Sequence, residues 1–350
     1  MKIQLNQVNT GTFFLSFIVL AIFIASCKSE DDSTPKVVVP DTLTVTTFNK
    51  SHHFFAGWSA EDNLRTIQQD FEFPESLDDY DKIFMEIQLE CPGNGCDPWD
   101  RAAFIEMITE ENGQEKIYEI GRYITPYKIG CNWTIDVSDY RNLLQGTVSL
   151  KSHIDTWTNP GWSLTVNFKF IEGEPEYSNI QVENLWYTQG VAYGVPEKPI
   201  PYPDGNVDIH SNAQKVKVKI VTTGHSFGNT GNAAEFFPAD HQLMINNEAK
   251  FTHHLWRSDC AQNPCSPQFG TWKFARAGWC PGADVIPEEF DITNNISPGE
   301  TINLKYQLMD YTNECRRDNP NCVTGVNCSD CENPPGEPFY RISVQVISYI

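Results

Sequence analysis

Residues 83–90 read Ile-Phe-Met-Glu-Ile-Gln-Leu-Glu, with apolar side chains at 83, 85, 87 and 89 and polar ones at 86, 88 and 90. Successive side chains of a β-strand point to opposite faces of its sheet, so this stretch predicts a strand with one apolar face. Strands buried on one face only are typical of antiparallel sheets. The same period of two recurs at Leu164–Phe170, Val216–Ile220, Ile302–Leu308 and Ile342–Val346.

Clusters of Gly, Pro and Asn separate these runs about every dozen residues, as expected between strands. Helical periodicity is scarce, and we expect one short helix over Ser59–Phe71. The sequence therefore predicts an all-β protein of two antiparallel β-sandwich domains. Glu-Gly-Glu-Pro-Glu at 172–176 breaks the alternation, which places a linker between domains at 44–174 and 179–350. Residues 196–204 hold four prolines and are expected to form a long loop.

The first 26 residues read as a signal peptide. Phe13 to Ala25 is almost wholly apolar, which is shorter than the ~20 residues of a membrane span and fits a signal core. Small residues precede Cys27 as in the lipobox of bacterial lipoproteins, so we expect acylation of Cys27 and a polar tether at 27–43. The protein would be exported and lipid-anchored, at the outer membrane or cell surface of a Gram-negative bacterium. An ordinary secretory signal is the alternative.

Export makes the cysteine content informative. Eleven cysteines less Cys27 leave an even ten in a compartment where disulfides persist. We expect two local pairs, Cys91 with Cys96 and Cys260 with Cys280. Four further cysteines crowd into one polar segment, where a four-thiolate zinc site is the alternative to disulfides; these are Cys315, Cys322, Cys328 and Cys331.

The charge balance is 46 acidic against 25 basic residues, a net charge of −21. Such a surface repels phosphate backbones, so no nucleic-acid partner is expected. We expect the chain to be a monomer.

The run Cys91-Pro-Gly-Asn-Gly-Cys96-Asp-Pro-Trp-Asp-Arg101 can close a small ring beside an aromatic, a carboxylate and a cation. Indole rings stack on apolar sugar faces, and charged groups bind sugar hydroxyls, so the run suits carbohydrate chemistry. A braced turn with solvated charges is the alternative. A second cluster, Arg276-Ala-Gly-Trp-Cys-Pro-Gly282, has the same character, and with Trp157 the two clusters indicate sugar recognition.

Three carboxylates stand in suggestive contexts. Asp100 has an aromatic and a basic neighbour, and Asp155 lies two residues before Trp157. Glu235 lies among apolar residues, which would desolvate it and raise its pKa. Each could instead be an ordinary loop carboxylate.

The histidines form no metal motif. His253 and His254 are adjacent on a predicted strand and would face opposite ways, so they could not ligate one ion together. There is no His-x-His, His-Glu-x-x-His or phosphate loop, and no metal is expected.

These motifs resemble bacterial peptide:N-glycosidase F, a family of amidases that remove N-linked glycans from asparagine. The Cys-Pro-x-x-x-Cys-Asp-x-Trp-Asp-Arg run matches 91–101, and Tyr-Glu-Ile-Gly-Arg-(Phe/Tyr)-Ile-Thr-Pro-Tyr matches 118–127. Ala-Glu-aromatic stands at 234–236, and the Arg-Ala-Gly-Trp-Cys-Pro-Gly motif at 276–282. The resemblance runs from about residue 46 to the last residue. It implies two side-by-side antiparallel jelly-roll β-sandwiches with the site at their interface.

Carried over by position, the catalytic carboxylates are Asp100 and Glu235. The reaction implied is hydrolysis of the bond between an N-linked glycan and asparagine in a glycoprotein or glycopeptide, giving aspartate and a glycosylamine. Asp100 would position or activate the reacting groups, and Glu235 would hold a bridging water. No metal or organic cofactor is implied. The sugar-contacting positions become Trp99, Arg101, Asp155, Trp157 and Arg276.

The chain departs from the family's pattern near both acids. Asp155 replaces a glutamate, and the cysteines that flank the family's second glutamate are Ala233 and Phe237 here. Phe236 and Thr223 each replace a tryptophan. Loss of a short-loop disulfide and displacement of a carboxylate would both lower activity. Residues 315–331 look like an insertion that either restores rigidity or reshapes access.

Two other functions are possible. A surface glycan receptor would keep the aromatic and basic positions, but it would not need both Asp100 and Glu235. A copper monooxygenase would need converging histidines and a methionine, and the absence of His-x-His argues against it.

Overall fold

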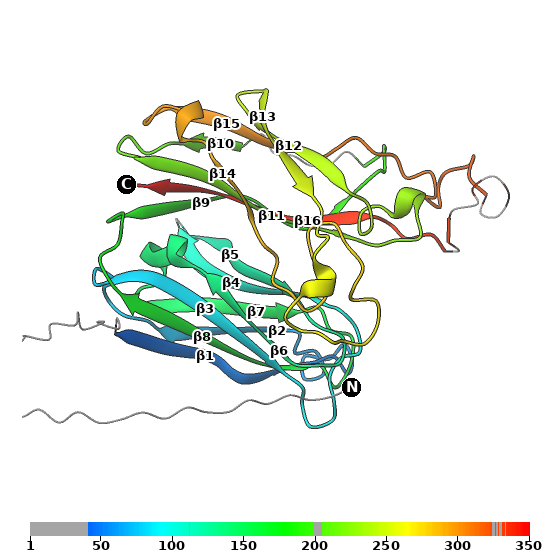
Figure 1. Cartoon of the computed structure of the whole chain (residues 1–350), viewed down its shortest axis with the longest axis horizontal. Coiled ribbons are helices and arrows are strands. Elements are labelled where there is room, and N and C mark those ends of the chain that lie inside the picture. The colour runs from blue at the N-terminus through cyan, green and yellow to red at the C-terminus, as the bar shows by residue number, and fades with distance from the viewer. Residues whose placement is uncertain are drawn as a thin grey trace, which may run out of the picture. The chain divides into compact units, whose positions relative to one another are not determined.

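The computed structural model describes residues 41–111, 113–198, 205–323, 326, 328, 331–332 and 334–350. The expected signal peptide, Cys27 and most of the tether lie outside them. Within the described residues, no helix has the length and apolar character needed to cross a bilayer. The described chain is built from β-strands with a few short 3₁₀ turns, arranged as four antiparallel sheets in two sandwiches (Figure 1).

The first sandwich uses eight strands from residues 42–172. One sheet has the order β1-β8-β3-β6: β1 Thr42–His53, β8 Trp162–Glu172, β3 Tyr80–Glu90 and β6 Cys131–Asp136. The facing sheet has the order β2-β7-β4-β5: β2 Thr66–Glu72, β7 Thr147–Ile154, β4 Ala102–Glu111 and β5 Gln114–Ile124.

The second sandwich uses the strands from residue 180 onward. One sheet has the order β14-β11-β16-β9: β14 Glu288–Asp291, β11 Lys215–His225, β16 Phe339–Tyr349 and β9 Ile180–Ala192. The other has the order β10-β15-β12-β13: β10 Gly205–Asp208, β15 Thr301–Gln307, β12 Ala239–Ile245 and β13 Glu248–Leu255. The expected all-β architecture of two jelly-roll sandwiches is confirmed.

The alternation read from residues 83–90 sets the core of the first sandwich. The apolar side chains at 83, 85, 87 and 89 are at most 2% exposed, and those at 164, 166, 168 and 170 of the neighbouring strand are fully buried. β3 pairs with β8 in a register that sets Met85 against Phe168 and Ile87 against Val166. Burial of these side chains against the facing sheet is the main source of stability, at about 2 kcal/mol for each large apolar side chain.

The helix expected over Ser59–Phe71 is wrong. Ser59 and Asp62 do form a local turn, with the Ser59 hydroxyl donating to Asp62 Oδ2 over 2.7 Å. The chain then enters β2, where Thr66 pairs with His153 of β7. The ladder to β7 supplies the backbone hydrogen bonds that a helix would have made, so tertiary pairing overrides the local pattern.

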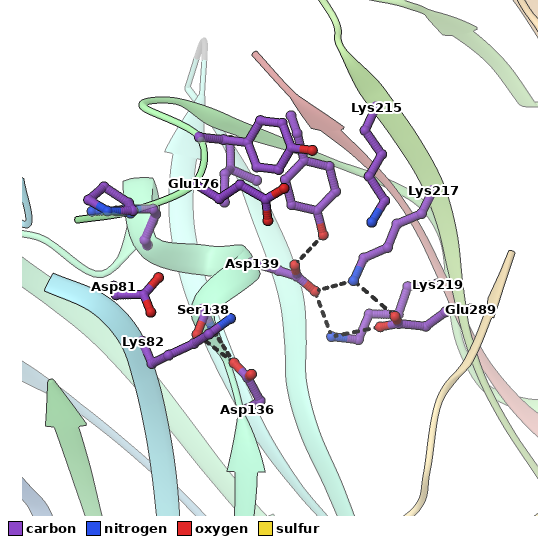
Figure 2. A pocket seen from close by; sticks show the side chains of 15 residues that line it. Asp81, Lys82, Asp136, Ser138, Asp139, Glu176, Lys215, Lys217, Lys219 and Glu289 are labelled. Atoms are coloured by element: carbon purple, nitrogen blue, oxygen red, sulfur yellow. Dashed lines mark hydrogen bonds and ion pairs between the residues drawn. The ribbon is translucent and has the colours of Figure 1, made fainter. Parts of the chain in front are cut away.

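The two inner sheets, β2-β7-β4-β5 and β14-β11-β16-β9, lie next to each other, and their contact is called the seam below (Figure 1). Alternation along β11 suggested a polar face in water, but Lys219 is only 7% exposed. Lys217 and Lys219 reach across the seam to Asp139 Oδ2 over 2.9 and 3.2 Å, and Tyr349 donates to its other oxygen over 2.5 Å (Figure 2). Although burial opposes it, the two lysine charges lower the pKa of Asp139 to about 2. The seam is therefore held by buried ion pairs as well as by apolar contact.

Ten cysteines form five disulfides in the described residues. The structure contains the two pairs expected from the sequence, Cys91–Cys96 and Cys260–Cys280. Cys131 of β6 pairs with Cys265 of the second sandwich and so ties the two sandwiches together. The crowded segment forms Cys315–Cys331 and Cys322–Cys328. Disulfide sulfurs are not thiolates, so this pairing supports the disulfide interpretation of the segment over the zinc alternative.

Candidate active site

The loop between β3 and β4 is fixed by a buried carboxylate. Asp97 is fully buried and accepts hydrogen bonds from the Trp99 backbone nitrogen over 3.0 Å and from the Thr156 hydroxyl over 2.5 Å. It also pairs with Arg101, whose Nε lies 2.9 Å from Asp97 Oδ2. Together with the Cys91–Cys96 disulfide, these contacts hold Trp99, 57% exposed, and Asp100 at the seam end of the loop.

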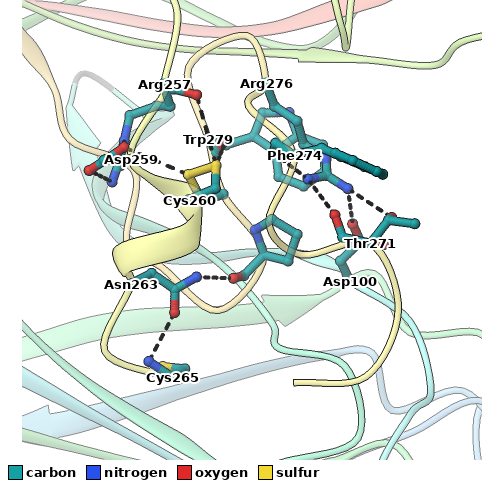
Figure 3. The surroundings of a disulfide bond; sticks show 12 residues. Asp100, Arg257, Asp259, Cys260, Asn263, Cys265, Thr271, Phe274, Arg276 and Trp279 are labelled. Carbon is teal, nitrogen blue, oxygen red and sulfur yellow. Dashed lines mark hydrogen bonds and ion pairs between the residues drawn. A yellow bond between two sulfur atoms is a disulfide. The ribbon is translucent and has the colours of Figure 1, made fainter. Parts of the chain in front are cut away.

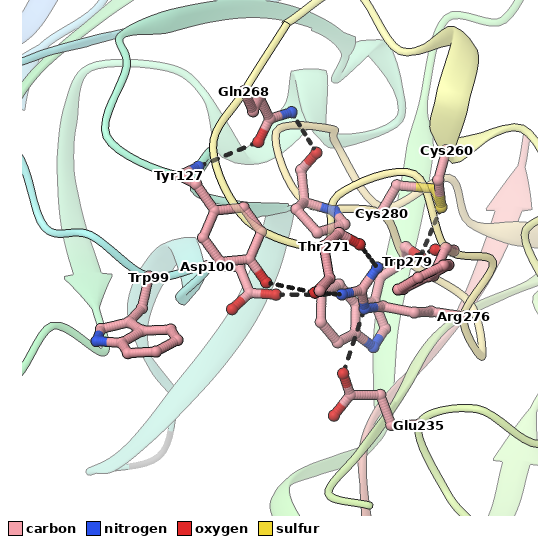
Figure 4. Close-up of polar contacts among 12 residues, drawn as sticks. Trp99, Asp100, Tyr127, Glu235, Cys260, Gln268, Thr271, Arg276, Trp279 and Cys280 are labelled. Atoms are coloured by element: carbon pink, nitrogen blue, oxygen red, sulfur yellow. Dashed lines mark hydrogen bonds and ion pairs between the residues drawn. A yellow bond between two sulfur atoms is a disulfide. The ribbon is translucent and has the colours of Figure 1, made fainter. Parts of the chain in front are cut away.

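Arg276 brings the two predicted catalytic carboxylates together. Its guanidinium is 1% exposed; Nε donates to Glu235 Oε1 over 3.2 Å, and Nη2 lies 3.8 Å from Asp100 Oδ2 (Figure 4). Asp100 comes from the first sandwich, whereas Glu235 and Arg276 come from loops of the second. The structure therefore places acids of both sandwiches around one cation at the seam, which no spacing in the sequence could prove.

The guanidinium is held in place by its own loop. Nη1 donates to the carbonyls of Thr271 and Phe274 over 3.3 and 2.9 Å, and the rings of Phe236 and Trp279 lie 5.1 and 4.8 Å from its central carbon. A cation fixed by carbonyls and aromatic faces needs no reorganisation to stabilise charge that develops beside it.

Both carboxylates have raised pKa values. Burial raises the pKa of Glu235 to about 7, against the charge of Arg276, and the neighbouring Asp100 adds to the rise. Burial also raises the pKa of Asp100, while a hydrogen bond from Tyr127 and the charge of Arg276 oppose the rise. The expectation that the surroundings of Glu235 raise its pKa is confirmed. An acid that titrates near neutral pH can gain or lose a proton during turnover.

Tyr127 is a site residue that the sequence analysis missed. Its hydroxyl lies 3.4 Å from Thr271 Oγ1 and faces Asp100, and its backbone nitrogen donates to Gln268 Oε1 over 3.1 Å (Figure 4). Burial raises the pKa of Tyr127, so this phenol stays protonated and can donate. Its place at the end of the 118–127 motif was the signal that could have identified it.

Two disulfides hold the loop that carries Arg276. Cys260, in the short 3₁₀ turn Cys260–Gln262, pairs with Cys280, and Asn263 Nδ2 donates to the Pro281 carbonyl over 2.6 Å (Figure 3). Five residues beyond Cys260, Cys265 makes the link to β6. The position of Arg276 is therefore coupled covalently to both sandwiches.

Asp155 and Trp157 lie in a neighbouring group organised by two other arginines. Asp155 accepts from Arg341 Nη2 over 2.9 Å and lies 3.7 Å from Arg65 Nη1. The Arg65 guanidinium stacks over Trp157 at 4.1 Å, and Trp58 meets Trp157 edge to face at 5.8 Å. Within the described residues, no hydrogen bond or ion pair joins this group to Asp100, Glu235 or Arg276. The groups are nevertheless adjacent, because the Asp155 nitrogen bonds to the carbonyl of residue 102, two residues beyond Asp100.

A groove of about 460 Å³ begins at Asp155 and runs along the seam. Its charges are paired within it: Arg341 with Asp155, and Lys151 with Glu106 over 2.7 Å. A groove of this size with balanced charge and aromatic walls suits a neutral, hydroxyl-rich ligand.

Arg65, Arg341 and Trp58 were also missed. Nothing in the sequence marks the two arginines, because their contacts with Asp155 form only on folding. Arg65 directly precedes β2, which pairs with β7, and Arg341 lies on β16 of the other sandwich. Trp58 carried a weak signal, as a tryptophan beside glycine and serine, and its 77% exposure distinguishes it from a core residue.

The two histidines proposed to face apart do so. His253 is buried and bonds to the Tyr306 hydroxyl over 2.7 Å, whereas His254 is exposed beside Asp240. In the described part of the chain, one group of three potential metal ligands lies close together, namely Cys322, Cys328 and Cys331. All three form disulfides.

Two jelly rolls meet at paired carboxylates and a fixed arginine, an arrangement that fits a hydrolase with a candidate site shared between domains. The family models for the N- and C-terminal parts of peptide-N-glycosidase F match residues 104–170 and 201–326. The chain is 30% identical to peptide-N(4)-(N-acetyl-beta-D-glucosaminyl)asparagine amidase F of Elizabethkingia miricola, over 93% of this chain and 92% of that protein. The chain belongs to the peptide-N-glycosidase F family.

Solved structures agree. A recombinant peptide:N-glycanase F superposes with a TM-score of 0.74 at 30% identity, covering 88% of this chain and 95% of that one. PNGase F, described as a glycosylasparaginase from Flavobacterium meningosepticum, gives 0.74 at 29% identity, covering 88% and 96%. PNGF-II gives 0.64 at 15% identity, covering 88% of this chain and 65% of that one, which shows a shared fold.

Proposed function

We propose that the chain hydrolyses the amide bond between an N-linked glycan and asparagine in glycoproteins or glycopeptides. The observation that carries this proposal is the contact of one buried guanidinium, Arg276, with both Asp100 and Glu235 across the seam. Family membership supports the same activity, since the related amidase is named for it. A receptor would gain nothing from burying two acids beside each other, which costs stability.

The proposed reaction adds water across the amide. The water oxygen bonds to the side-chain carbonyl carbon, the carbon–nitrogen bond breaks, and the nitrogen leaves with a proton as the glycosylamine, with aspartate remaining in the peptide. Glu235, ionised above pH 7, holds the water and takes up its proton. Asp100 and the Tyr127 hydroxyl orient the amide, and Arg276 stabilises charge on the tetrahedral oxygen.

The proposed sugar-binding residues differ in availability. Trp99 and Trp157 are exposed and can stack on sugar faces. Arg101 and Asp155 are already engaged by Asp97 and by Arg341, so they present their remaining polar atoms to a sugar rather than a free charge. Because Asp155 is short and held by arginines, we propose that it contacts a hydroxyl through water.

We further propose domains at 44–174 and 179–350, and a monomer that is exported and anchored by lipid on Cys27. Five disulfides support the export, because such bonds persist in oxidising compartments. Uptake of labelled fatty acid by the wild type, lost in Cys27→Ala, tests the anchor; label retained in that variant contradicts it.

The activity is tested by incubating the purified protein with a denatured high-mannose glycoprotein. Gel mobility should rise and mass spectrometry should show asparagine converted to aspartate. Asp100→Asn should abolish release while the protein stays folded, and Glu235→Gln should reduce release by about 100-fold or more.

Asp240→Asn and Glu248→Gln change exposed carboxylates of the second sandwich and serve as matched controls with wild-type rates. Full activity of Asp100→Asn would refute the mechanism. Cleavage that leaves one sugar on asparagine would indicate a glycosidase, and glycan binding without release would indicate the receptor.

A further inference from the structure

The loop between β11 and β12, residues 226–238, carries Glu235 and has no disulfide of its own. Four of its residues have positive φ: two are glycines, Asn232 at 54° is of a type that tolerates this region, and Ser226 at 81° is in an unfavourable left-handed conformation. The end near Glu235 is tied to the body of the sandwich by the Ala277 nitrogen, which donates to the Glu235 carbonyl over 2.8 Å. The far end, residues 228–232, needs a separate support to keep the strained loop in one conformation.

That support is the base of the segment between β15 and β16. The hydroxyl of Thr230 accepts hydrogen bonds from the backbone nitrogens of Glu314 and Cys315 over 2.9 and 3.3 Å. Asn313 Oδ1 lies 3.4 Å from both the nitrogen and the hydroxyl of Thr230, and Tyr311 donates its hydroxyl to the Thr230 carbonyl over 2.7 Å. Four of the five residues at 311–315 thus contact this one threonine.

A second contact comes from the returning side of the segment. The Glu332 nitrogen donates to the Gly228 carbonyl over 3.0 Å. Glu332 directly follows Cys331, and Cys331 is bonded to Cys315, which contacts Thr230. A single disulfide therefore joins the two places where the segment grips the loop.

The base of the segment is itself rigid. Tyr311 stacks on Tyr193, which is 1% exposed, with ring centroids 4.6 Å apart. The Asn313 nitrogen donates to the Gly194 carbonyl over 2.9 Å, and the Asn313 side chain is buried. These contacts anchor the loop, through the segment, to the sheet that contains β9 and β16.

We propose that the segment closed by Cys315–Cys331 is a positioning element for Glu235, that Thr230 is the residue through which it acts, and that reduction of this disulfide lowers turnover. The inference rests on the proposed function in assigning a catalytic role to Glu235. Thr230 does not reach the reacting atoms; it acts by limiting the conformations of the loop. Loss of its hydroxyl should therefore lower kcat and leave substrate affinity unchanged.

The test compares Thr230→Val with Thr252→Val, a matched change at an exposed threonine of β13 in the same sandwich. Thr230→Val should lower kcat by about tenfold with KM within about twofold, since displacements of a catalytic group below 1 Å already cost this much. Thr230→Ser keeps the hydroxyl and should restore the rate. Amide hydrogen exchange of residues 226–237 should accelerate in Thr230→Val and stay unchanged in Thr252→Val.

A second pair of variants replaces each disulfide of the segment. The double variant Cys315→Ser with Cys331→Ser should accelerate amide exchange in residues 226–237 and lower kcat. The double variant Cys322→Ser with Cys328→Ser should have a much smaller effect, because that disulfide lies next to neither contact with the loop. Exchange is measured without substrate, so it tests the support of the loop independently of activity. A wild type without amidase activity would overturn the proposed function alone. If the loop exchanges at the wild-type rate both in Thr230→Val and in the double variant of Cys315 and Cys331, the segment does not support the loop. A drop in affinity at unchanged kcat would overturn the positioning role.

Discussion

Glu235→Gln should make the protein more stable at alkaline pH while strongly lowering its activity. The folded protein holds the pKa of Glu235 at about 7 because the side chain is buried, whereas the unfolded chain has a value near 4.5. Between these two values the unfolded state releases its proton and the folded state does not. Rising pH therefore favours unfolding, and the full cost is present above pH 7.

The size of the effect follows from the two pKa values. A rise from 4.5 to about 7 corresponds to about 3 kcal/mol at 1.36 kcal/mol per pKa unit. The side chain is 12% exposed, so solvent screening removes little of this. Glutamine cannot titrate, so the stability of the variant relative to the wild type should increase by about 2 to 3 kcal/mol between pH 5 and pH 8.

Urea unfolding of both proteins at pH 5, 6, 7 and 8, with disulfides intact, measures this difference directly. Glu248→Gln, which changes an exposed glutamate, should show a difference that stays nearly constant with pH. If the free-energy difference for Glu235→Gln does not vary between pH 5 and pH 8, the carboxylate is not destabilised by burial, and its proposed titration near neutral pH is wrong.

Three further results are expected. In Trp58→Ala, KM for the glycoprotein should rise about fivefold because stacking on the sugar is lost. The free energy of unfolding should stay within about 0.5 kcal/mol of the wild-type value, because the ring is 77% exposed. An unchanged KM in steady-state assays would exclude this ring from binding. Asp139→Asn should lower the free energy of unfolding by about 2 kcal/mol, since buried Lys219 and partly buried Lys217 lose one of their two anions and keep only Glu289. The wild type should lose this contribution as pH falls from about 4 to about 2, and urea unfolding that shows neither effect would contradict the seam ion pairs. In the wild type, kcat/KM should rise with pH with a midpoint near 7, as Glu235 ionises. The charge of Arg276 lowers the pKa of Glu235, so the midpoint for the remaining activity of Arg276→Gln should lie at higher pH. An unchanged midpoint would show that another group causes the rise.

Period-two patterning predicted the strands well, because burial of one face is a local property that each strand records in its own residues. The prediction of a helix instead of a strand at Thr66–Glu72 failed because this edge strand has no buried face. Only Ile67 and Phe71 are partly buried, so the sequence shows little alternation of apolar and polar residues. The lysines of β11 show a second limit. Alternation separates two faces of a strand, but whether the polar face meets water or another sheet depends on how the sandwiches pack.

The sequence by itself determined the all-β class, the two local disulfides, the aromatic and charged clusters and the raised pKa that apolar neighbours give Glu235. Each of these follows from residues close to one another in the chain. The tertiary structure alone decided the contact of Asp100 with Arg276 and the ion pairs of Asp155 with Arg65 and Arg341. It also decided the disulfide between Cys131 and Cys265 and the hydrogen bonds of Thr230 with the segment around Cys315. Those partners lie far apart in the chain and meet only after apolar burial forms the two sandwiches and the ion pairs of the seam hold them together.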